Sequence, residues 1–258
     1  MAWYHENRRD LPWRGTPNPY FTLVSEAMLQ QTQVDRVIPR FAAFVDRWPT
    51  VGDLASAERA EVVAAWSGLG YNARAVRLHE AACLVARDGW PSTPTDLQQL
   101  PGVGPYTAAA IASIAFGVTV PAVDTNLKRV LSRWAGEPLS GASLAAFAAE
   151  SVVEPSGDWN QAMMDLGAGL CRPRSPRCGD CPVAGWCADP TVYQPPPAQS
   201  RFEGSNRQLR GALVRAHVEG RDLVEAGSAL GRTDSEVTDA VQNLIGEGLL
   251  PSSAYELT

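Results

Sequence analysis

Four of the five cysteines fall within one short segment, at Cys171, Cys178, Cys181 and Cys187. Their spacing, C-x6-C-x2-C-x5-C, lets a single loop bring four thiolates around one centre. Such ligation suits an iron–sulfur cluster or a zinc ion. Disulfides are the alternative, but they are rare in proteins without an export signal. Zinc ribbons usually contain two C-x2-C pairs and this segment contains one, yet spacing alone leaves zinc and iron–sulfur open.

Two carboxylates stand where they could act on a glycosidic bond. Asp124 follows an apolar stretch and opens a predicted helix, so capping is its ordinary role. An Asp at a helix mouth can also face a cleft and stabilise a sugar cation. Glu26 lies among apolar residues of another helical stretch. Most such side chains are solvated, but a partly buried Glu has a raised pKa and can act as an acid near neutral pH.

Several other segments carry features of nucleic-acid contact. The turn Leu100-Pro101-Gly102-Val103-Gly104 lies between two helical stretches, and its glycines would let a phosphate approach free N–H groups of the next helix. A plain helix–helix turn is the simpler interpretation. Gln30 and Gln31 carry donors and acceptors suited to base edges. Tyr71 follows a tight Gly-Leu-Gly turn, either as a core residue or as a wedge for the base stack.

Helical periodicity dominates the chain, and alternating strand patterns are scarce, so we predict an all-α fold. The predicted helical stretches are 21–31, 34–48, 58–66, 72–87, 105–116, 125–134, 143–153 and 158–170. The stretch 105–116 is apolar almost all round and should be buried. Cys83 lies in a helical stretch, where we expect a packed core thiol. Three consecutive prolines within 191–207 indicate a linker, and 208–258 should form a small helical unit, for which a winged helix is one possible form.

The net charge of −6 at first argues against a nucleic-acid partner. However, residues 171–215 hold seven basic and three acidic side chains, while residues 216–258 hold two and eight. A local basic face is enough to hold phosphates, so the net charge excludes nothing. No apolar run is long enough for a membrane span, and the N-terminus lacks the apolar core of a signal peptide. We therefore expect a soluble, cytoplasmic protein with no membrane partner.

Taken together, these motifs resemble the endonuclease III superfamily, and most closely the MutY-type adenine DNA glycosylases. The resemblance covers roughly residues 1–190. It rests on the cysteine loop and on the segments 8–14, 25–33, 68–74, 100–107, 123–130 and 160–167. The order and spacing of these motifs make it specific.

The resemblance implies a [4Fe–4S] cluster on the four cysteines and two lobes with DNA between them. Residues 1–20 and 134–190 would form the iron–sulfur lobe, and residues 21–133 a helical barrel lobe with the helix-hairpin-helix. The partner would be double-stranded DNA with a mismatched or damaged base pair, bound by a monomer.

The resemblance also implies roles for individual residues. A base must leave the helix before it is excised. Glu26 matches the acid that protonates adenine, and Asp124 the carboxylate that stabilises the oxocarbenium-like sugar. Tyr106 and Asn126 match supporting pocket residues. Residues that match the surroundings of the bound adenine are Arg9, Leu11, Trp13, Arg14 and Asp165; Gln31 and Tyr71 match side chains that fill or wedge the stack.

The resemblance therefore predicts excision of adenine paired with 8-oxoguanine or guanine. Bifunctional relatives have a lysine where this chain has Tyr106, so we expect no efficient strand cleavage. The only lysine, Lys128, should make a salt bridge or a phosphate contact.

Two departures from the family stand out. Asn72 replaces a frequent second tyrosine, and the family's C-terminal Phe-Ser-His reader of 8-oxoguanine is absent from this sequence. The alternatives are a thymine or uracil mismatch glycosylase, and an inactive DNA-binding iron–sulfur protein.

Overall fold

The computed structural model describes residues 1–193, 195 and 201–257. All regular structure in this part of the chain is helical, which confirms the all-α prediction. Part of the predicted linker, at 194 and 196–200, lies outside the described residues. None of the described helices combines the length and the apolar character that crossing a bilayer requires.

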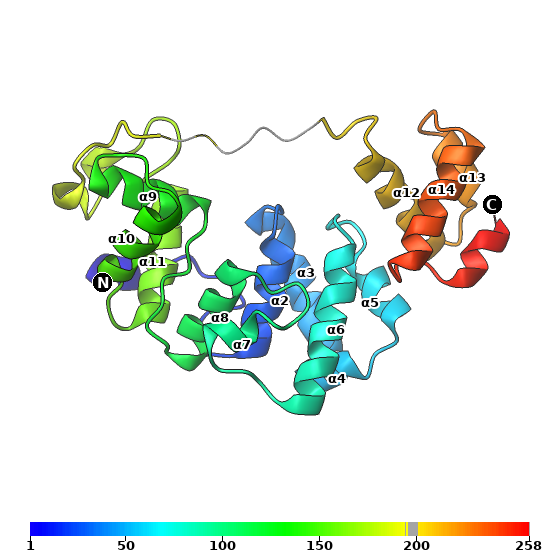
Figure 1. Cartoon of the computed structure of the whole chain (residues 1–258), viewed down its shortest axis with the longest axis horizontal. Coiled ribbons are helices and arrows are strands. Elements are labelled where there is room, and N and C mark those ends of the chain that lie inside the picture. The colour runs from blue at the N-terminus through cyan, green and yellow to red at the C-terminus, as the bar shows by residue number, and fades with distance from the viewer. Residues whose placement is uncertain (194, 196–200, 258) are drawn as a thin grey trace. The chain divides into compact units, whose positions relative to one another are not determined.

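The first helices form the N-terminal third of the chain (Figure 1). Their bounds are α1 (Ala2–Asn7), α2 (Pro19–Leu29), α3 (Val34–Arg47), α4 (Val51–Ala55), α5 (Arg59–Trp66), α6 (Ala73–Asp88) and α7 (Pro94–Leu97). The longer ones agree with the predicted stretches to within a few residues. The short helices α1, α4 and α7 were not predicted, because four to six residues are too few to show a helical period.

The remaining helices include the segments that carry the cysteines and the C-terminal unit. They are α8 (Pro105–Phe116), α9 (Thr125–Ala135), α10 (Gly141–Ser151), α11 (Ser156–Gly169), η1 (Cys178–Asp180), η2 (Ala184–Trp186), α12 (Asn206–Val218), α13 (Leu223–Ser228), α14 (Asp234–Gly246) and η3 (Ser252–Leu257). As predicted, α8 is buried over most of its length.

The described chain divides into two compact units. One comprises Met1–Leu23, Pro91–Gln99 and Val103–Pro197, and the other Val24–Trp90, Leu100–Gly102 and Ala198–Thr258. This division differs from the expected lobes, since residues 103–133 belong to the unit that holds the cysteines. The lobe boundaries therefore stay a prediction.

The core of the first unit lies between α9, α10 and α11, which pack side by side (Figure 1). Leu127, Leu131, Trp159 and Leu166 are all buried there. Two of the cysteines, Cys171 and Cys181, pack against the edge of this core. The thiol loop is therefore anchored on the same helices that present Asp124.

The second unit buries the aromatic rings of Phe41, Phe44 and Trp66. One prediction is wrong here: Cys83 is exposed on α6 and contributes no packed core thiol. An amphipathic helix of this length leaves one face in water, and position 83 falls on that face, between the buried residues Ala82 and Val85.

Candidate functional site

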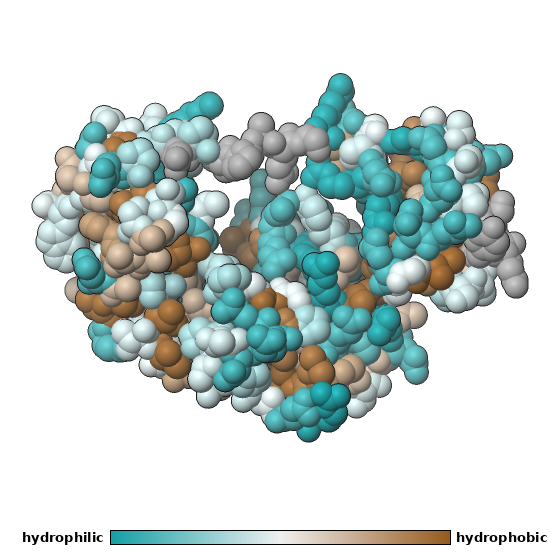
Figure 2. All heavy atoms as spheres, viewed as in Figure 1, coloured by the Kyte–Doolittle hydropathy of each residue, from teal (hydrophilic) through white to brown (hydrophobic). Residues whose placement is uncertain are grey.

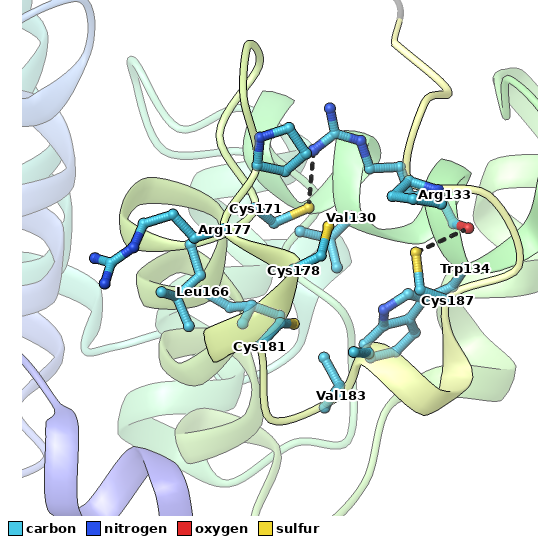
Figure 3. Close-up of a pocket in the computed structure, with 14 residues that line it drawn as sticks. Val130, Arg133, Trp134, Leu166, Cys171, Arg177, Cys178, Cys181, Val183 and Cys187 are labelled. Atoms are coloured by element: carbon cyan, nitrogen blue, oxygen red, sulfur yellow. Dashed lines mark hydrogen bonds between the residues drawn. The ribbon is translucent and has the colours of Figure 1, made fainter.

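The four cysteines of the loop line one pocket (Figure 3). Cys171 follows the end of α11, Cys178 starts η1, and Cys181 and Cys187 each follow a 3₁₀ turn. These turns are closed by backbone hydrogen bonds, from the Cys181 N–H to the Cys178 carbonyl and from the Cys187 N–H to the Ala184 carbonyl. The short turns thus return the chain to the same pocket after each cysteine.

The donor set of this pocket fits an iron–sulfur cluster. None of the four cysteines is in a disulfide, so each sulfur is available as a thiolate ligand. One thiolate for each iron is the usual ligation of a four-iron cluster. The walls between the sulfurs include Val130, Leu166 and Val183. In the described residues no three His, Cys, Asp or Glu side chains converge as a single metal ion would require.

The side chain of Arg133 holds both ends of the cysteine loop through hydrogen bonds. Its guanidinium donates to the Cys171 sulfur at 3.1 Å, to the Arg172 carbonyl at 2.9 Å and to the Val192 carbonyl at 2.9 Å. The side chain is 2% exposed, so this buried cation depends on these acceptors. Sequence reasoning did not find Arg133, because its partners lie about 40 to 60 residues away along the chain.

Asp124 lies at the N-terminus of α9 and caps it, as its position predicts. One carboxylate oxygen accepts the Leu127 N–H at 2.6 Å, and the other accepts the Asn126 side-chain N–H at 2.9 Å. The side-chain oxygen of Asn126 accepts a hydrogen bond from Arg129 Nη2 at 2.9 Å. The Nε of Arg129 donates to the backbone carbonyl of Cys171 at 2.8 Å. A continuous chain of hydrogen bonds therefore joins the Asp124 carboxylate to the first cysteine of the loop.

The pKa of Asp124 is raised above its ordinary value because the carboxyl is largely desolvated. The hydrogen bonds from Leu127 and Asn126 and the charge of Arg129 act in the opposite direction and lower the pKa. The carboxyl is thus poorly solvated, and in its ionised form it would interact strongly with a developing positive charge.

Gly167 lets α11 approach this network closely. A Cβ at this position would lie 2.7 Å from the Cβ of Asn126, closer than any carbon contact can be. The Gly167 carbonyl also accepts from Arg129 at 2.7 Å. The glycine is therefore part of what holds Asn126 beside Asp124.

Asp165 joins α11 to the N-terminal segment. Its carboxylate accepts two hydrogen bonds from Arg14, at 2.7 and 2.9 Å, and one from Arg9 Nε at 2.6 Å. Burial alone would raise the pKa of Asp165, but Arg14 and then Arg9 hold it below its usual range. Leu11, which lies between the two arginines along the sequence, is buried, and Trp13 is half-buried. The structure thus brings Arg9, Arg14 and Asp165 together.

In the second unit, Arg74 holds the end of α2 against the turn before Tyr71. Its Nη1 donates to the carbonyls of Ala27 at 2.7 Å and Gln30 at 2.7 Å, and its Nη2 to that of Gly70 at 2.8 Å. Burial lowers the pKa of Arg74 to about 10, so it stays charged at neutral pH. This arginine satisfies helix-end carbonyls that otherwise have no partner within the helix.

Glu26, Gln30, Gln31 and Tyr71 all lie on the segments that Arg74 fastens. Glu26 is 8% exposed in α2, whereas Gln30 and Gln31 are exposed at its end. Gln31 and Tyr71 both have positive φ, at 58° and 49°, which is unusual for residues other than glycine. Such conformations persist where surrounding contacts hold them, and they cluster at functional sites.

The predicted hairpin turn joins α7 to α8. Gly102 has a φ of +78°, and a Cβ there would lie 3.0 Å from Arg77 Cβ, so the turn requires glycine. Val103 is buried, while Gly104 begins α8 without a side-chain cap, and a Cβ there would meet nothing within 4 Å. The start of α8 therefore presents uncapped backbone N–H groups to an open surface.

The remaining predicted residues are placed as follows. Tyr106 lies in the first turn of α8, with its hydroxyl 3.9 Å from the Met164 sulfur. Lys128 is half-buried in α9, and among the described residues it forms no salt bridge. Glu26 and Asp124 belong to different compact units.

Comparison with known proteins gives two family matches. A sequence model of the HhH-GPD superfamily base excision DNA repair proteins matches residues 24–155. The iron–sulfur binding domain of endonuclease III matches residues 171–187, which are the bounds of the cysteine loop. The chain therefore carries a [4Fe–4S] cluster.

Individual relatives agree with these matches. The chain is 42% identical over 230 residues to the adenine DNA glycosylase of Mycobacterium tuberculosis H37Rv, covering 83% of this chain and 75% of that protein. It is 44% identical over 206 residues to human adenine DNA glycosylase, covering 72% and 38%. Among solved structures, a thermostable thymine-DNA glycosylase matches with a TM-score of 0.67 and 31% identity, covering 72% of this chain and 91% of that one.

Proposed function

Because the chain belongs to the HhH-GPD superfamily of base excision DNA repair proteins, we propose that it is an adenine DNA glycosylase without efficient strand-cleaving activity. Its substrate is adenine mispaired with 8-oxoguanine or guanine in double-stranded DNA, and it acts as a monomer. The observation that carries the proposal is the desolvated carboxylate of Asp124, held at the mouth of α9 by Leu127 and Asn126.

The chemistry requires a flipped adenine and two carboxyl groups. Glu26, buried in α2, gives a proton to the adenine ring and weakens its bond to the sugar. Asp124 stabilises the positive charge that develops on the sugar as this bond breaks. Asn126 and Arg129 are positioning residues, because Asn126 donates to the Asp124 carboxylate and Arg129 donates to Asn126.

The other site residues bind and distort the DNA. The uncapped N-terminus of α8, after Gly104, takes a backbone phosphate. Tyr71 and Gln31 enter the space that the flipped base leaves, and both are exposed residues with positive φ. The iron–sulfur cluster, when bound, orders the 171–187 loop and thereby supports Arg129 and Arg133.

An excision panel tests the substrate. Duplexes carry adenine, thymine or uracil opposite guanine or 8-oxoguanine, and product is measured as alkali-labile strand. Adenine should be removed from both pairs. The ratio of the two excision rates measures the preference between 8-oxoguanine and guanine as the opposite base.

A thymine or uracil mismatch glycosylase is the second candidate, favoured by the 31% identity to a thymine-DNA glycosylase structure. Removal of thymine or uracil but not adenine in the same panel would establish that candidate and reject ours. No removal of any base, with DNA binding retained, would indicate an inactive DNA-binding protein.

Borohydride trapping tests the absence of strand cleavage. A lyase forms a Schiff base between an amine and the sugar, which borohydride reduces to a stable protein–DNA adduct. Tyr106 offers no amine, so the adduct should be a trace product. A high yield that disappears in Lys128→Ala would contradict the assignment and identify the lysine responsible.

A further inference from the structure

The segment 117–123 joins α8 to α9 and leads directly into Asp124, the residue that caps α9. These residues lie outside any helix, yet part of the segment is buried, since Ala122 is 0% exposed. Buried backbone N–H and C=O groups need hydrogen-bond partners, which here have to come from other parts of the fold. The groups that pair with this backbone therefore also determine where Asp124 lies.

Asn160 of α11 provides such partners. Its side-chain oxygen accepts the Ala122 N–H at 2.8 Å, and its side-chain nitrogen donates to the Val120 carbonyl at 2.9 Å. The same nitrogen donates to the Ser113 hydroxyl of α8 at 2.9 Å. Because a backbone N–H can only donate and a carbonyl can only accept, the two backbone groups determine which way the amide points.

This pairing is like the one that a neighbouring β-strand would give. Along an extended chain, the C=O of one residue and the N–H of the residue two positions later point to the same side, where an adjacent strand can bind both. Here one side chain binds the C=O of Val120 and the N–H of Ala122. An ionised aspartate has no donor and a leucine has neither group, so the two backbone groups together require the amide of Asn160.

The amide of Asn160 lies inside the first compact unit. The residue is 0% exposed, and α11 packs on both α8 and α9. Figure 2 shows hydrophobic and hydrophilic residues side by side on the surface around α10 and α11, and the buried amide lies beneath that surface. Gly157 allows the close packing, since a Cβ there would lie 2.9 Å from the Ser113 carbonyl oxygen. Water therefore has no access to replace a hydrogen bond that Asn160 loses.

The helix α11 contacts the chain on both sides of Asp124. Before Asp124, Asn160 holds the backbone of Ala122, and after it, Gly167 leaves room for the Cβ of Asn126. Positions 160 and 167 are seven residues apart, which places them on the same face of the helix. This face of α11 therefore fixes the chain where it enters Asp124 and where it leaves it.

From this arrangement we propose that Asn160 is a positioning residue for the carboxylate of Asp124. Without the amide, the Ala122 N–H and the Val120 carbonyl lose their partner, and the segment has to move to find others. Asp124 follows Ala122 by two residues, so it moves with the segment. The inference rests on the role of Asp124 in the proposed function, but not on adenine as the substrate.

Single-turnover excision by the full-length, cluster-loaded protein tests this proposal. The substrate carries the base that the unchanged protein removes in the excision panel, and the affinity for the same duplex is measured alongside. Asn160→Ala should lower the single-turnover rate by about 10- to 100-fold, the cost of moving a catalytic group by about 1 Å. The dissociation constant for DNA should stay close to that of the unchanged protein, because Asp124 acts on the glycosidic bond.

Ser156→Ala is the matched control. Ser156 is 1% exposed, lies on the same helix and donates to the Val118 carbonyl at 2.9 Å, at the end of the segment that is farther from Asp124 along the chain. Each alanine variant removes hydrogen bonds to the segment, so both should lower the free energy of unfolding. Only Asn160→Ala should slow excision by folded protein. Equal slowing in both variants would overturn the proposal, since the segment would then act through stability alone.

Asn160→Asp provides a second test that keeps the shape of the side chain. Its ionised carboxylate can accept the Ala122 N–H but cannot donate to Val120, whereas the protonated acid has one O–H donor. The ratio of its excision rate to that of the unchanged protein should therefore rise as the pH falls. A ratio close to one at every pH would overturn the proposal.

Hydrogen exchange of the Leu127 amide reports the position of the carboxylate without any excision, because this N–H donates to Asp124 at 2.6 Å. It should exchange faster in Asn160→Ala and at the unchanged rate in Ser156→Ala. If the unchanged protein removes no base but Leu127 responds in this way, only the proposed function fails. If the unchanged protein excises adenine, and neither excision nor exchange changes in Asn160→Ala, only the role of Asn160 fails.

Discussion

At the scale of single residues, Asp124 combines a structural and a chemical role. It caps α9 through Leu127, and the same carboxylate is desolvated enough to have a raised pKa. A raised pKa means that the folded state favours the protonated form. The protonated carboxyl stabilises the fold fully at pH values below the pKa of Asp124 in the unfolded state. This stabilisation is lost as the pH rises through the pKa of Asp124 in the folded state. Once ionised, the carboxylate therefore contributes less to stability than its protonated form does.

Two substitutions separate these roles. Asp124→Asn keeps an oxygen that can accept the Leu127 N–H and removes the buried charge, so the free energy of unfolding at pH 7 should be unchanged or higher. Asp124→Ala removes the cap and should lose about 1 kcal/mol. Both should reduce the rate of excision at least 100-fold, because the charge opposite the sugar is gone.

Denaturant unfolding and single-turnover excision are measured for both variants, with the wild-type chain as reference. Equal loss of stability in the two variants would show that the carboxylate charge, and not the cap, is what α9 requires. Excision by Asp124→Asn at the wild-type rate would reject the role of Asp124 in catalysis.

Residue types and their order were enough to predict that the four loop cysteines gather around one centre, that Asp124 caps α9 and that a glycine turn precedes α8. They did not predict Arg74, Arg129 or Arg133. Each of these arginines acts by donating to backbone carbonyls that are distant in sequence, such as that of Cys171. Carbonyls are present at every position, so nothing in the residue pattern distinguishes the ones that an arginine will reach. A buried arginine is found only when the fold is known.

At the scale of helices, the packing of α11 on α9 determines where Asn126 lies. The two helices meet at Gly167, whose missing side chain leaves room for the Asn126 Cβ. Helical periodicity predicted both helices but not this contact, because the sequence around a glycine in a helix does not indicate which residue packs against it. The close approach also brings the Gly167 carbonyl to Arg129.

Gly167→Ala should therefore damage the site without unfolding the protein. The added methyl must displace Asn126 or the helix by about 1 Å, because carbon atoms pack at roughly 3.5–4.0 Å. A displacement of this size can cost about 100-fold in rate. We expect excision to fall by one to two orders of magnitude, and the free energy of unfolding to fall by about 1–3 kcal/mol.

Gly169→Ala is the control, since it lies in the same helix and its added methyl would meet nothing within 4 Å. It should raise stability by about 0.5–1 kcal/mol, as alanine does in place of glycine within a helix. Excision at the wild-type rate by Gly167→Ala would mean that Asn126 does not support Asp124 in catalysis.

At the scale of the whole molecule, the iron–sulfur loop and the C-terminal unit should differ in what keeps them folded. Most residues from 172 to 186 are exposed, so the loop buries little apolar surface of its own. The C-terminal unit buries Leu209, Leu213, Val237 and Leu244 in its own core. The cluster should therefore hold the cysteine loop in place where a hydrophobic core is missing. The C-terminal unit should not need the cluster in order to fold.

Loss of the cluster should consequently loosen α9 and α11 but not α12 to α14. Without an ordered loop, Arg133 loses the carbonyls of Arg172 and Val192, and a buried cation that loses its partners costs about 3–5 kcal/mol. Arg129 loses the Cys171 carbonyl in the same way.

Hydrogen exchange is measured on Cys178→Ser, and the visible absorption of the cluster shows how much cluster each sample contains. Backbone amides of α9 and α11 should exchange faster by orders of magnitude, while those of α12 and α14 keep their protection. Cys83→Ser, which changes the exposed fifth cysteine, should retain both the cluster and the wild-type exchange pattern. Two results would contradict the prediction. Faster exchange throughout the chain of Cys178→Ser would show that the C-terminal unit depends on the cluster for its fold. Unchanged exchange in α9 would show that Arg133 and Arg129 do not depend on the ordered loop.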